Sequence, residues 1–377
     1  MIPYGRQSID ADDISAVVDV LRSDWLTTGP KVADFERAFA NHVGAKFAVA
    51  VSSGTAALHC AMYALGIGPG DEVIVPPMTF TATANCVVYQ GGIPVFVDVD
   101  PETLLIDAEK AEAAITENTK AIIAVDYTGQ PCDYDALRTI AKKHSLALLS
   151  DACHALGARY KDKMVGSLAD LNVFSFHPVK HITTGEGGMI TTDNPAFDQR
   201  MRMFRNHGIT TDHRLRESKG TWFYEMVDIG YNYRITDFQC ALGISQLRKN
   251  PHWIAKRQAI ASRYDSAFRK IETVRPLEVR ANVFHAYHLY VIRLGSEERR
   301  LDRGAIFKEL RDDGIGVNVH YIPAHLHPYY QSRFGTHRGL CPVAEYAYDS
   351  ILSLPLFPTM SQGEVEEVID SLSKVIG

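Results

Sequence analysis

The fold of this chain is indicated most clearly by Ser175-Phe-His-Pro-Val-Lys180-His-Ile-Thr-Thr-Gly-Glu-Gly-Gly188. Apolar runs at 171–176 and 189–192 predict two short buried strands, so Lys180 lies between them in partly apolar surroundings. Desolvation disfavours the charged form of a lysine, which lowers the pKa of the amine and makes it a nucleophile toward an aldehyde. The alternative is an exposed loop lysine, and the neighbouring segments argue against it.

Short apolar runs alternate with segments of helical spacing on the N-terminal side of this stretch. Predicted strands cover residues 47–51, 72–75, 94–97, 121–125 and 147–150, and predicted helices cover 56–65, 80–89, 108–115 and 134–144. This alternation with short loops is typical of an α/β domain with a mainly parallel sheet. In such sheets ligands bind beyond the carboxyl ends of the strands.

Two further polar features are expected at the same edge of the sheet. Ser52-Ser-Gly-Thr55 joins a strand to a helix, where backbone NH groups and hydroxyls can bind an anion, although Ser and Thr also serve as ordinary helix caps. Asp151 ends an apolar strand, and a carboxylate buried there needs a partner. That partner is either an arginine or the protonated ring nitrogen of a pyridine cofactor, which a carboxylate keeps cationic.

The pattern changes near residue 250, which predicts two domains. We expect a large α/β domain at 13–250 and a small α+β domain at 251–377, with residues 1–12 packing on the small one. After a helix at 238–247, the predicted elements are a helix at 251–271, strands at 286–294 and 316–320, and helices at 304–311, 343–351 and 361–375. Residues 213–225 are expected to be irregular.

Bulk composition excludes several classes of function. The 377 residues carry 39 basic and 45 acidic side chains without a basic block, so neither nucleic acid nor a membrane surface is an expected partner. No apolar run reaches the roughly 18–20 residues that span a bilayer, and the first residues lack a signal core, so we expect a cytoplasmic protein. Six scattered cysteines predict reduced thiols and no metal site.

Four motifs in this order resemble a known family: Ser-Ser-Gly-Thr-Ala-Ala-Leu58, Ser-Asp-Ala-Cys-His-Ala155, Ser-Phe-His-Pro-Val-Lys180 and Tyr-Asn-Tyr-Arg-Ile-Thr236. They are similar to those of fold-type I enzymes that use pyridoxal 5′-phosphate, and more narrowly to the DegT/DnrJ/EryC1/StrS sugar aminotransferases. The resemblance runs from Tyr4 to the last helix. It implies an aspartate aminotransferase-like fold, a transaminase acting on a nucleotide sugar with L-glutamate, and a homodimer with shared active sites.

The resemblance also implies a role for individual residues. Lys180 would hold the cofactor covalently and carry a proton, and Asp151 would pair with the pyridine nitrogen. The implied phosphate contacts are Gly54, Thr55, Ser175 and, from the neighbouring subunit, Asn232; Phe80 would stack on the ring, and His154, a Gln in many relatives, would lie close to it. The implied substrate-binding residues are Tyr4, Asp24, Trp25, Leu26, Thr27, His320, Tyr321, Ile322 and Pro323.

The likeness is greatest to the branch that aminates carbon 4 of UDP-linked 4-keto-6-deoxy sugars. His181 stands where close relatives often carry Pro or Asn. Substrates of the 4-amino-arabinose, bacillosamine or perosamine type remain an alternative. A dehydratase of the same family would carry His in place of Lys180, a regulatory protein would not need Lys180 and Asp151, and a nicotinamide dehydrogenase would need a G-x-G-x-x-G turn after its first strand.

Overall fold

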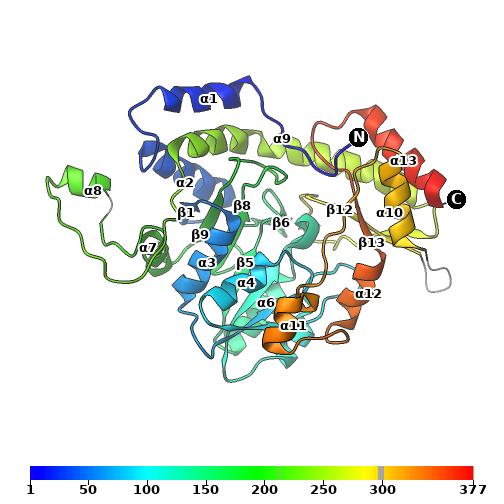
Figure 1. Ribbon diagram of the computed structural model, residues 1–377, viewed down its shortest axis with the longest axis horizontal. Helices are drawn as coiled ribbons and strands as arrows, with labels where there is room; N and C mark the ends of the chain where they lie inside the picture. The colour runs from blue at the N-terminus through cyan, green and yellow to red at the C-terminus, as the bar shows by residue number, and fades with distance from the viewer. Residues whose placement is uncertain (212, 296–300, 377) are drawn as a thin grey trace.

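A seven-stranded sheet forms the centre of the larger part of the molecule (Figure 1). The computed structural model describes residues 1–211, 213–295 and 301–376. In spatial order the strands are β1 (Phe47–Val51), β9 (Gly188–Thr192), β8 (Leu171–Ser175), β5 (Ala147–Asp151), β4 (Thr119–Val125), β2 (Glu72–Val75) and β3 (Ile93–Phe96). Strand β9 is antiparallel to both neighbours, whereas the pairs from β8 to β3 are parallel. The predicted mainly parallel sheet is confirmed.

The strands of this sheet are apolar and buried on both faces because helices cover them. Every residue of β9 is buried, and β1 and β5 are buried after their first residue. Such continuous burial is typical of a sheet enclosed between helices. The helices of this part are α2 (Pro30–Val43), α3 (Gly54–Leu65), α4 (Ala82–Tyr89), α5 (Ala108–Ala113), α6 (Tyr134–Lys143), α7 (Pro195–Phe204) and α8 (His213–Ser218).

The long helix α9 (Asp237–Phe268) runs beside α1 (Ala11–Leu21) along one side of the molecule (Figure 1). Thr236 and Gln239 form a capping box at its start. The predicted break between helices at 238–247 and 251–271 is wrong, because the helix continues through Pro251. Residues on both sides of this proline, Asn250 and Trp253 among them, are buried. Tertiary packing thus outweighs the hydrogen bond that a proline removes.

A second, smaller apolar cluster lies in the C-terminal part. It is built on the antiparallel sheet β10 (Val274–Pro276), β12 (Tyr290–Leu294) and β13 (Ile351–Leu354), with helices α10 (Arg303–Asp312) and α13 (Gln362–Ile376). Ile2 belongs to this cluster, and its backbone pairs with Gly314 and Gly316. The division at residues 250 and 251, with residues 1–12 on the small part, remains a proposal. Ile2 packs in the small cluster, whereas Trp253 and Ile351 pack in the large cluster around the central sheet.

Two local predictions are wrong, and one strand was missed. Residues 316–320 form no strand, because the backbone of this stretch pairs with β13 only through the isolated bridge between Asn318 and Ser353. The missed strand is β13, which pairs with β12 and begins directly after helix α12 (Pro342–Ser350). Helix α8 lies within the segment expected to be irregular.

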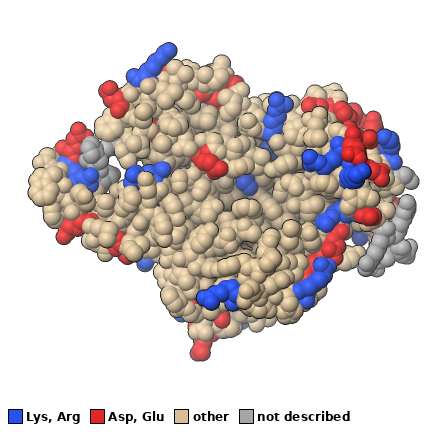
Figure 2. All heavy atoms as spheres, in the orientation of Figure 1, with Lys and Arg blue, Asp and Glu red and all other residues tan. Residues whose placement is uncertain are grey.

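The remaining elements are short: η1 (Tyr127–Gly129), β6 (Arg159–Tyr160), β7 (Lys163–Met164), β11 (Val283–Phe284), η2 (Ala324–Leu326) and α11 (Pro328–Phe334). Within the described ranges no helix combines the length and apolar character that a bilayer crossing requires. On the face shown in Figure 2, basic side chains are interspersed with acidic ones.

Candidate active site

Asp151 lies at the carboxyl end of β5, where the parallel sheet directs it toward the expected ligand edge. It is 6% exposed, and it accepts hydrogen bonds from Thr83 Oγ1 (2.6 Å) and from the backbone NH of Cys153 (3.2 Å). Both donors are neutral, and within the described residues no arginine forms an ion pair with this carboxylate. The arginine partner considered from the sequence is therefore not found, and Asp151 retains the capacity to pair with a cationic ligand.

Lys180 follows the neighbouring strand β8 and is half-buried. Its Nζ lies 3.4 Å from Nε2 of His288. Desolvation lowers the pKa of the Lys180 amine, while the negative charge of Asp151 acts in the opposite direction. The chain thus presents a lysine of reduced basicity close to a buried carboxylate, the combination that favours nucleophilic attack on an aldehyde.

The start of α3 packs closely against the end of β8. Ser53 Oγ accepts a hydrogen bond from the backbone NH of Ala56 (3.0 Å). Gly54 and Thr55 are the first two residues of α3, so their backbone NH groups have no carbonyl acceptor within the helix. A Cβ placed on Gly54 would come within 2.8 Å of Ser175 Cβ. Glycine thus keeps a backbone amide open beside a serine hydroxyl, and the arrangement fits a phosphate group.

Aromatic and imidazole side chains contact one another just beyond the end of β5. His154 Nε2 lies 3.0 Å from the Tyr321 hydroxyl, and their rings are near-parallel at 25° with centroids 6.0 Å apart. The ring of Phe80, 60% exposed, lies 6.2 Å from that of Tyr321. Burial lowers the pKa of His154 well below its usual value, so its imidazole is neutral at pH 7. A flat heteroaromatic ring suits these surroundings.

The segment after residue 318 carries four expected substrate residues. His320 Nδ1 lies 2.9 Å from Ser353 Oγ, and the Tyr4 ring is 5.3 Å from the His320 ring. Burial lowers the pKa of His320 to about 3. Ile322 is exposed and Pro323 is buried, and the peptide beyond them is tied to the large part by Ala324 NH and the carbonyl of Pro77 (2.8 Å).

The other expected residues lie at the start of α9. The NH of Asp237 donates to the carbonyl of Leu26 (3.0 Å), and Thr27 and Thr236 form a bridge. Asn232 is exposed and bridges Asn206. Asp24, Leu26 and Thr27 are exposed, and Trp25 is half-buried. The backbones of Leu26 and Thr27 thus contact the start of α9, and the backbone of Asn232 contacts Asn206. These contacts do not involve the residues around Lys180.

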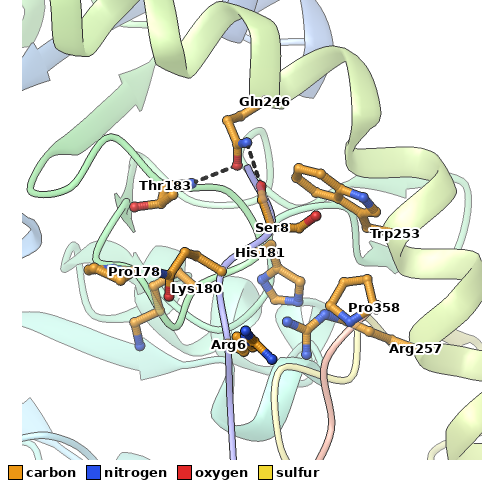
Figure 3. A pocket seen from close by; sticks show the side chains of 11 residues that line it. Arg6, Ser8, Pro178, Lys180, His181, Thr183, Gln246, Trp253, Arg257 and Pro358 are labelled. Atoms are coloured by element: carbon orange, nitrogen blue, oxygen red, sulfur yellow. Dashed lines mark hydrogen bonds between the residues drawn. The ribbon is translucent and has the colours of Figure 1, made fainter. Parts of the chain in front are cut away.

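Two residues of the site were missed from the sequence. His288 touches Lys180, and Arg257 of α9 is fully buried with Nη1 donating to the carbonyls of Tyr287, His288 and Leu356 (3.2, 3.3 and 2.9 Å). His288 could have been noticed in the sequence, because it is a polar residue within the largely apolar predicted strand at 286–294. Figure 3 shows Lys180 and Arg257 lining one small pocket together with His181.

Comparisons with known proteins agree with this geometry. The model of the DegT/DnrJ/EryC1/StrS aminotransferase family matches residues 7–373. The spore coat polysaccharide biosynthesis protein SpsC of Bacillus subtilis is 43% identical over 377 residues, which cover all of this chain and 97% of SpsC.

Two solved structures are similar along the whole chain. The sugar aminotransferase Spr1654 of Streptococcus pneumoniae, solved in PMP and PLP forms, is 36% identical, with TM-scores of 0.94 and 0.93. The alignments cover 100% of this chain and 99% and 98% of the two Spr1654 chains. Helicobacter pylori PseC, an aminotransferase involved in the biosynthesis of pseudoaminic acid, is 34% identical with a TM-score of 0.93, covering 100% of this chain and 99% of PseC.

Proposed function

The chain belongs to the DegT/DnrJ/EryC1/StrS aminotransferase family and is a pyridoxal 5′-phosphate-dependent sugar aminotransferase; from this premise we propose which substrate it aminates. The proposed reaction moves an amino group from L-glutamate to carbon 4 of a UDP-linked 4-keto-6-deoxy-N-acetylhexosamine. It is the reaction of UDP-4-amino-4,6-dideoxy-N-acetyl-β-L-altrosamine transaminase, in pseudaminic acid biosynthesis. The full-length similarity to PseC supports this substrate.

The proposed cofactor contacts follow from the open positions of the site. Asp151 would receive the pyridine nitrogen, the amides of Gly54 and Thr55 and the hydroxyl of Ser175 would bind the phosphate, and Phe80 would cover the ring. His154 would lie close to the ring, with its hydrogen bond to Tyr321 fixing its orientation. When bound, pyridoxal phosphate supplies an aldehyde that reacts with amines and a ring that accepts electrons.

The observation that carries the catalytic proposal is the position of Lys180 and Asp151 beyond or at the carboxyl ends of the adjacent strands β8 and β5. An amine whose pKa is lowered by desolvation takes up and releases a proton closer to neutral pH than an exposed lysine does. Lys180 Nζ would therefore both attach the cofactor and carry the proton. The neutral imidazoles of His154 and His320 line this space without adding a competing positive charge.

The proposed active unit is a homodimer, in which each subunit completes the site of the other. Between α8 and Asn232 the chain exposes seven large apolar side chains, from 42% to 84% exposed: Trp222, Phe223, Tyr224, Met226, Val227, Ile229 and Tyr231. An apolar area of this kind on one chain is typical of a protein–protein interface. The arm that carries α8 projects from the body in Figure 1. Asn232, with Asp24, Trp25, Leu26 and Thr27, would enter the partner's site.

A second candidate is a different nucleotide sugar. SpsC is 43% identical, more than PseC, and its name refers to spore coat polysaccharide. A substrate of the 4-amino-arabinose, bacillosamine or perosamine type therefore stays in consideration.

The deciding experiment is product analysis by mass spectrometry. Purified protein with pyridoxal phosphate and L-glutamate is incubated with a panel of UDP- and dTDP-linked 4-keto-6-deoxy sugars, and Lys180→Ala serves as the matched control. The proposal predicts that the UDP-linked N-acetylhexosamine with the L-altrosamine precursor stereochemistry is aminated fastest. Faster amination of any other member of the panel contradicts the proposed substrate. If the wild-type protein aminates no member of the panel, the proposed reaction is contradicted.

A further inference from the structure

His288 lies against Lys180 inside the protein. Its Nε2 is 3.4 Å from Lys180 Nζ, and its ring centroid is 4.4 Å from that of His154 and 5.5 Å from that of His181. The side chain is 4% exposed, so water has little access to this contact. Nδ1 of His288 is buried and has no hydrogen-bond partner among the described residues. The contact to Lys180 is thus the hydrogen bond that the imidazole makes within the described chain.

The backbone around His288 holds the ring in place. The NH of Ala286 donates to the carbonyl of Gly129 (2.9 Å), and the NH of Leu289 donates to that of Thr128 (3.2 Å). From the other side Arg257 Nη1 binds the carbonyl of His288 itself (3.3 Å). The segment is fixed on both sides of the ring, which leaves the imidazole little freedom to move away from Lys180.

The charges around this pair keep the imidazole neutral. Burial lowers the pKa of His288 well below its usual value, and the positive charge of Lys180 adds to the effect, as does that of Arg257. A neutral imidazole can accept a hydrogen bond at the nitrogen that faces an ammonium. The titratable and charged groups that face Lys180 and its histidine partner are Asp151, Cys153, His154, His181, His320 and Arg257.

We propose that His288 is a positioning residue for Lys180, with Nε2 accepting a hydrogen bond from the protonated amine. This inference rests on the proposed function, in which Lys180 carries the proton. A half-buried ammonium that loses water needs a hydrogen-bond acceptor. The hydrogen bonds of Asp151 are with Thr83 and Cys153, so the acceptor for Lys180 is the imidazole of His288. The bond stabilises the charged form and so offsets part of the desolvation. The proton stays on Lys180, and His288 keeps the protonated state accessible and correctly oriented.

The test measures the protonation of Lys180 in protein free of cofactor. Trace acetylation with acetic anhydride at a series of pH values, followed by mass spectrometry of the peptide containing Lys180, gives the midpoint at which the amine becomes reactive. For His288→Phe we expect that midpoint to fall by about one pH unit, a tenfold change in the ratio of amine to ammonium. His288→Gln, whose side-chain oxygen can replace the acceptor, should restore most of the wild-type midpoint. An unchanged or higher midpoint in His288→Phe overturns the proposal.

Two controls separate this effect from misfolding. His285 is equally buried and belongs to the same segment, but its contacts are with Thr128 and the NH of Tyr287. His285→Asn keeps an acceptor for that NH and should leave the Lys180 midpoint unchanged; an equal shift there contradicts a specific role for His288. If His288→Phe does not fold, as judged by circular dichroism, His288→Met replaces it with the same expected fall.

The same preparation distinguishes failure of this inference from failure of the proposed function. Wild-type protein is loaded with pyridoxal phosphate and reduced with borohydride. Labelling of Lys180 together with an unshifted midpoint in His288→Phe refutes the role of His288 alone. Absence of cofactor on Lys180 refutes the proposed function, on which the role of His288 depends.

Discussion

Among the described residues, the hydrogen-bond donors to the buried carboxylate of Asp151 are neutral, which is costly unless a cationic group completes its surroundings. Thr83 fixes one oxygen and Cys153 the other. The pyridine nitrogen of the cofactor is the group expected to fill this need. The importance of Asp151 could be predicted from the sequence, because a charged residue at the buried end of an apolar strand requires a partner.

Replacement of Asp151 by asparagine, which has nearly the same size, tests whether the carboxylate pairs with the pyridine nitrogen. The amide cannot keep a pyridine nitrogen protonated, so we expect kcat to fall by roughly 10²-fold or more. Cofactor should also be retained more weakly, as measured by equilibrium dialysis. The control is Asp135→Asn on the exposed surface of α6, which should keep wild-type values. Near-normal turnover of Asp151→Asn would show that another group protonates the ring.

Gly54 is the second residue whose identity the proposed site requires. A methyl group there would approach Ser175 Cβ to 2.8 Å and would push apart the two segments that are proposed to bind the phosphate. We expect Gly54→Ala to weaken cofactor binding by about tenfold or more, a loss of about 1.4 kcal/mol. Fluorescence titration with pyridoxal phosphate measures it. Gly363→Ala is the control, because a Cβ there meets only Ser361 Oγ at 4.0 Å. Equal affinity of Gly54→Ala and wild type would refute the phosphate assignment.

His288 shows why other site residues escaped prediction. Its importance comes from a contact with Lys180, which is 108 residues earlier in the chain. Spacing along the sequence carries no information about such a contact. Lys180 and Asp151 were predictable because each follows a strand of one parallel sheet, whose carboxyl ends share an edge.

At the scale of elements, burial explains both the correct and the wrong predictions. The strands of the central sheet are short apolar runs between helices, and this pattern is local. Strand β13 directly follows α12, and its pairing with β12 depends on residues far apart in sequence. The continuity of α9 through Pro251 likewise depends on packing against α1 and α2, which no local rule includes.

Pro251 offers a test of that packing argument. In a helix interior proline is about 3 kcal/mol less favourable than alanine, and its stiffness in the unfolded chain returns up to about 1 kcal/mol. We therefore expect Pro251→Ala to raise the free energy of unfolding by roughly 2 kcal/mol, measured by denaturant titration. A lower stability would show that the packing of α9 requires the local geometry that this proline imposes.

At the scale of the whole molecule, the expected site residues fall into two groups. One group surrounds Lys180, and the other, with Asn232, lies at the start of α9 beside the exposed apolar segment 222–231. The resemblance implied two subunits sharing each site, whereas composition and periodicity gave no indication of it. A dimer would bring the second group of one chain to the first group of another.

Mixing two inactive variants tests this arrangement. In a heterodimer of Lys180→Ala with Asn232→Ala, one site combines the intact lysine of one chain with the intact asparagine of the other. After mixing with subunit exchange, activity should recover to about one quarter of wild type, since half of randomly formed dimers are mixed and each contains one intact site. Analytical ultracentrifugation confirms the dimer. Activity no higher than the sum of the separate variants would place Asn232 and Lys180 in the same chain's site.

The central claim is that Lys180 is the residue that binds the cofactor. The protein is loaded with pyridoxal phosphate, reduced with borohydride, digested and examined by mass spectrometry. The account predicts a phosphopyridoxyl group on Lys180 of the wild type and none on the Lys180→Ala variant. A wild-type protein labelled at a different lysine, with Lys180 unmodified, would contradict it.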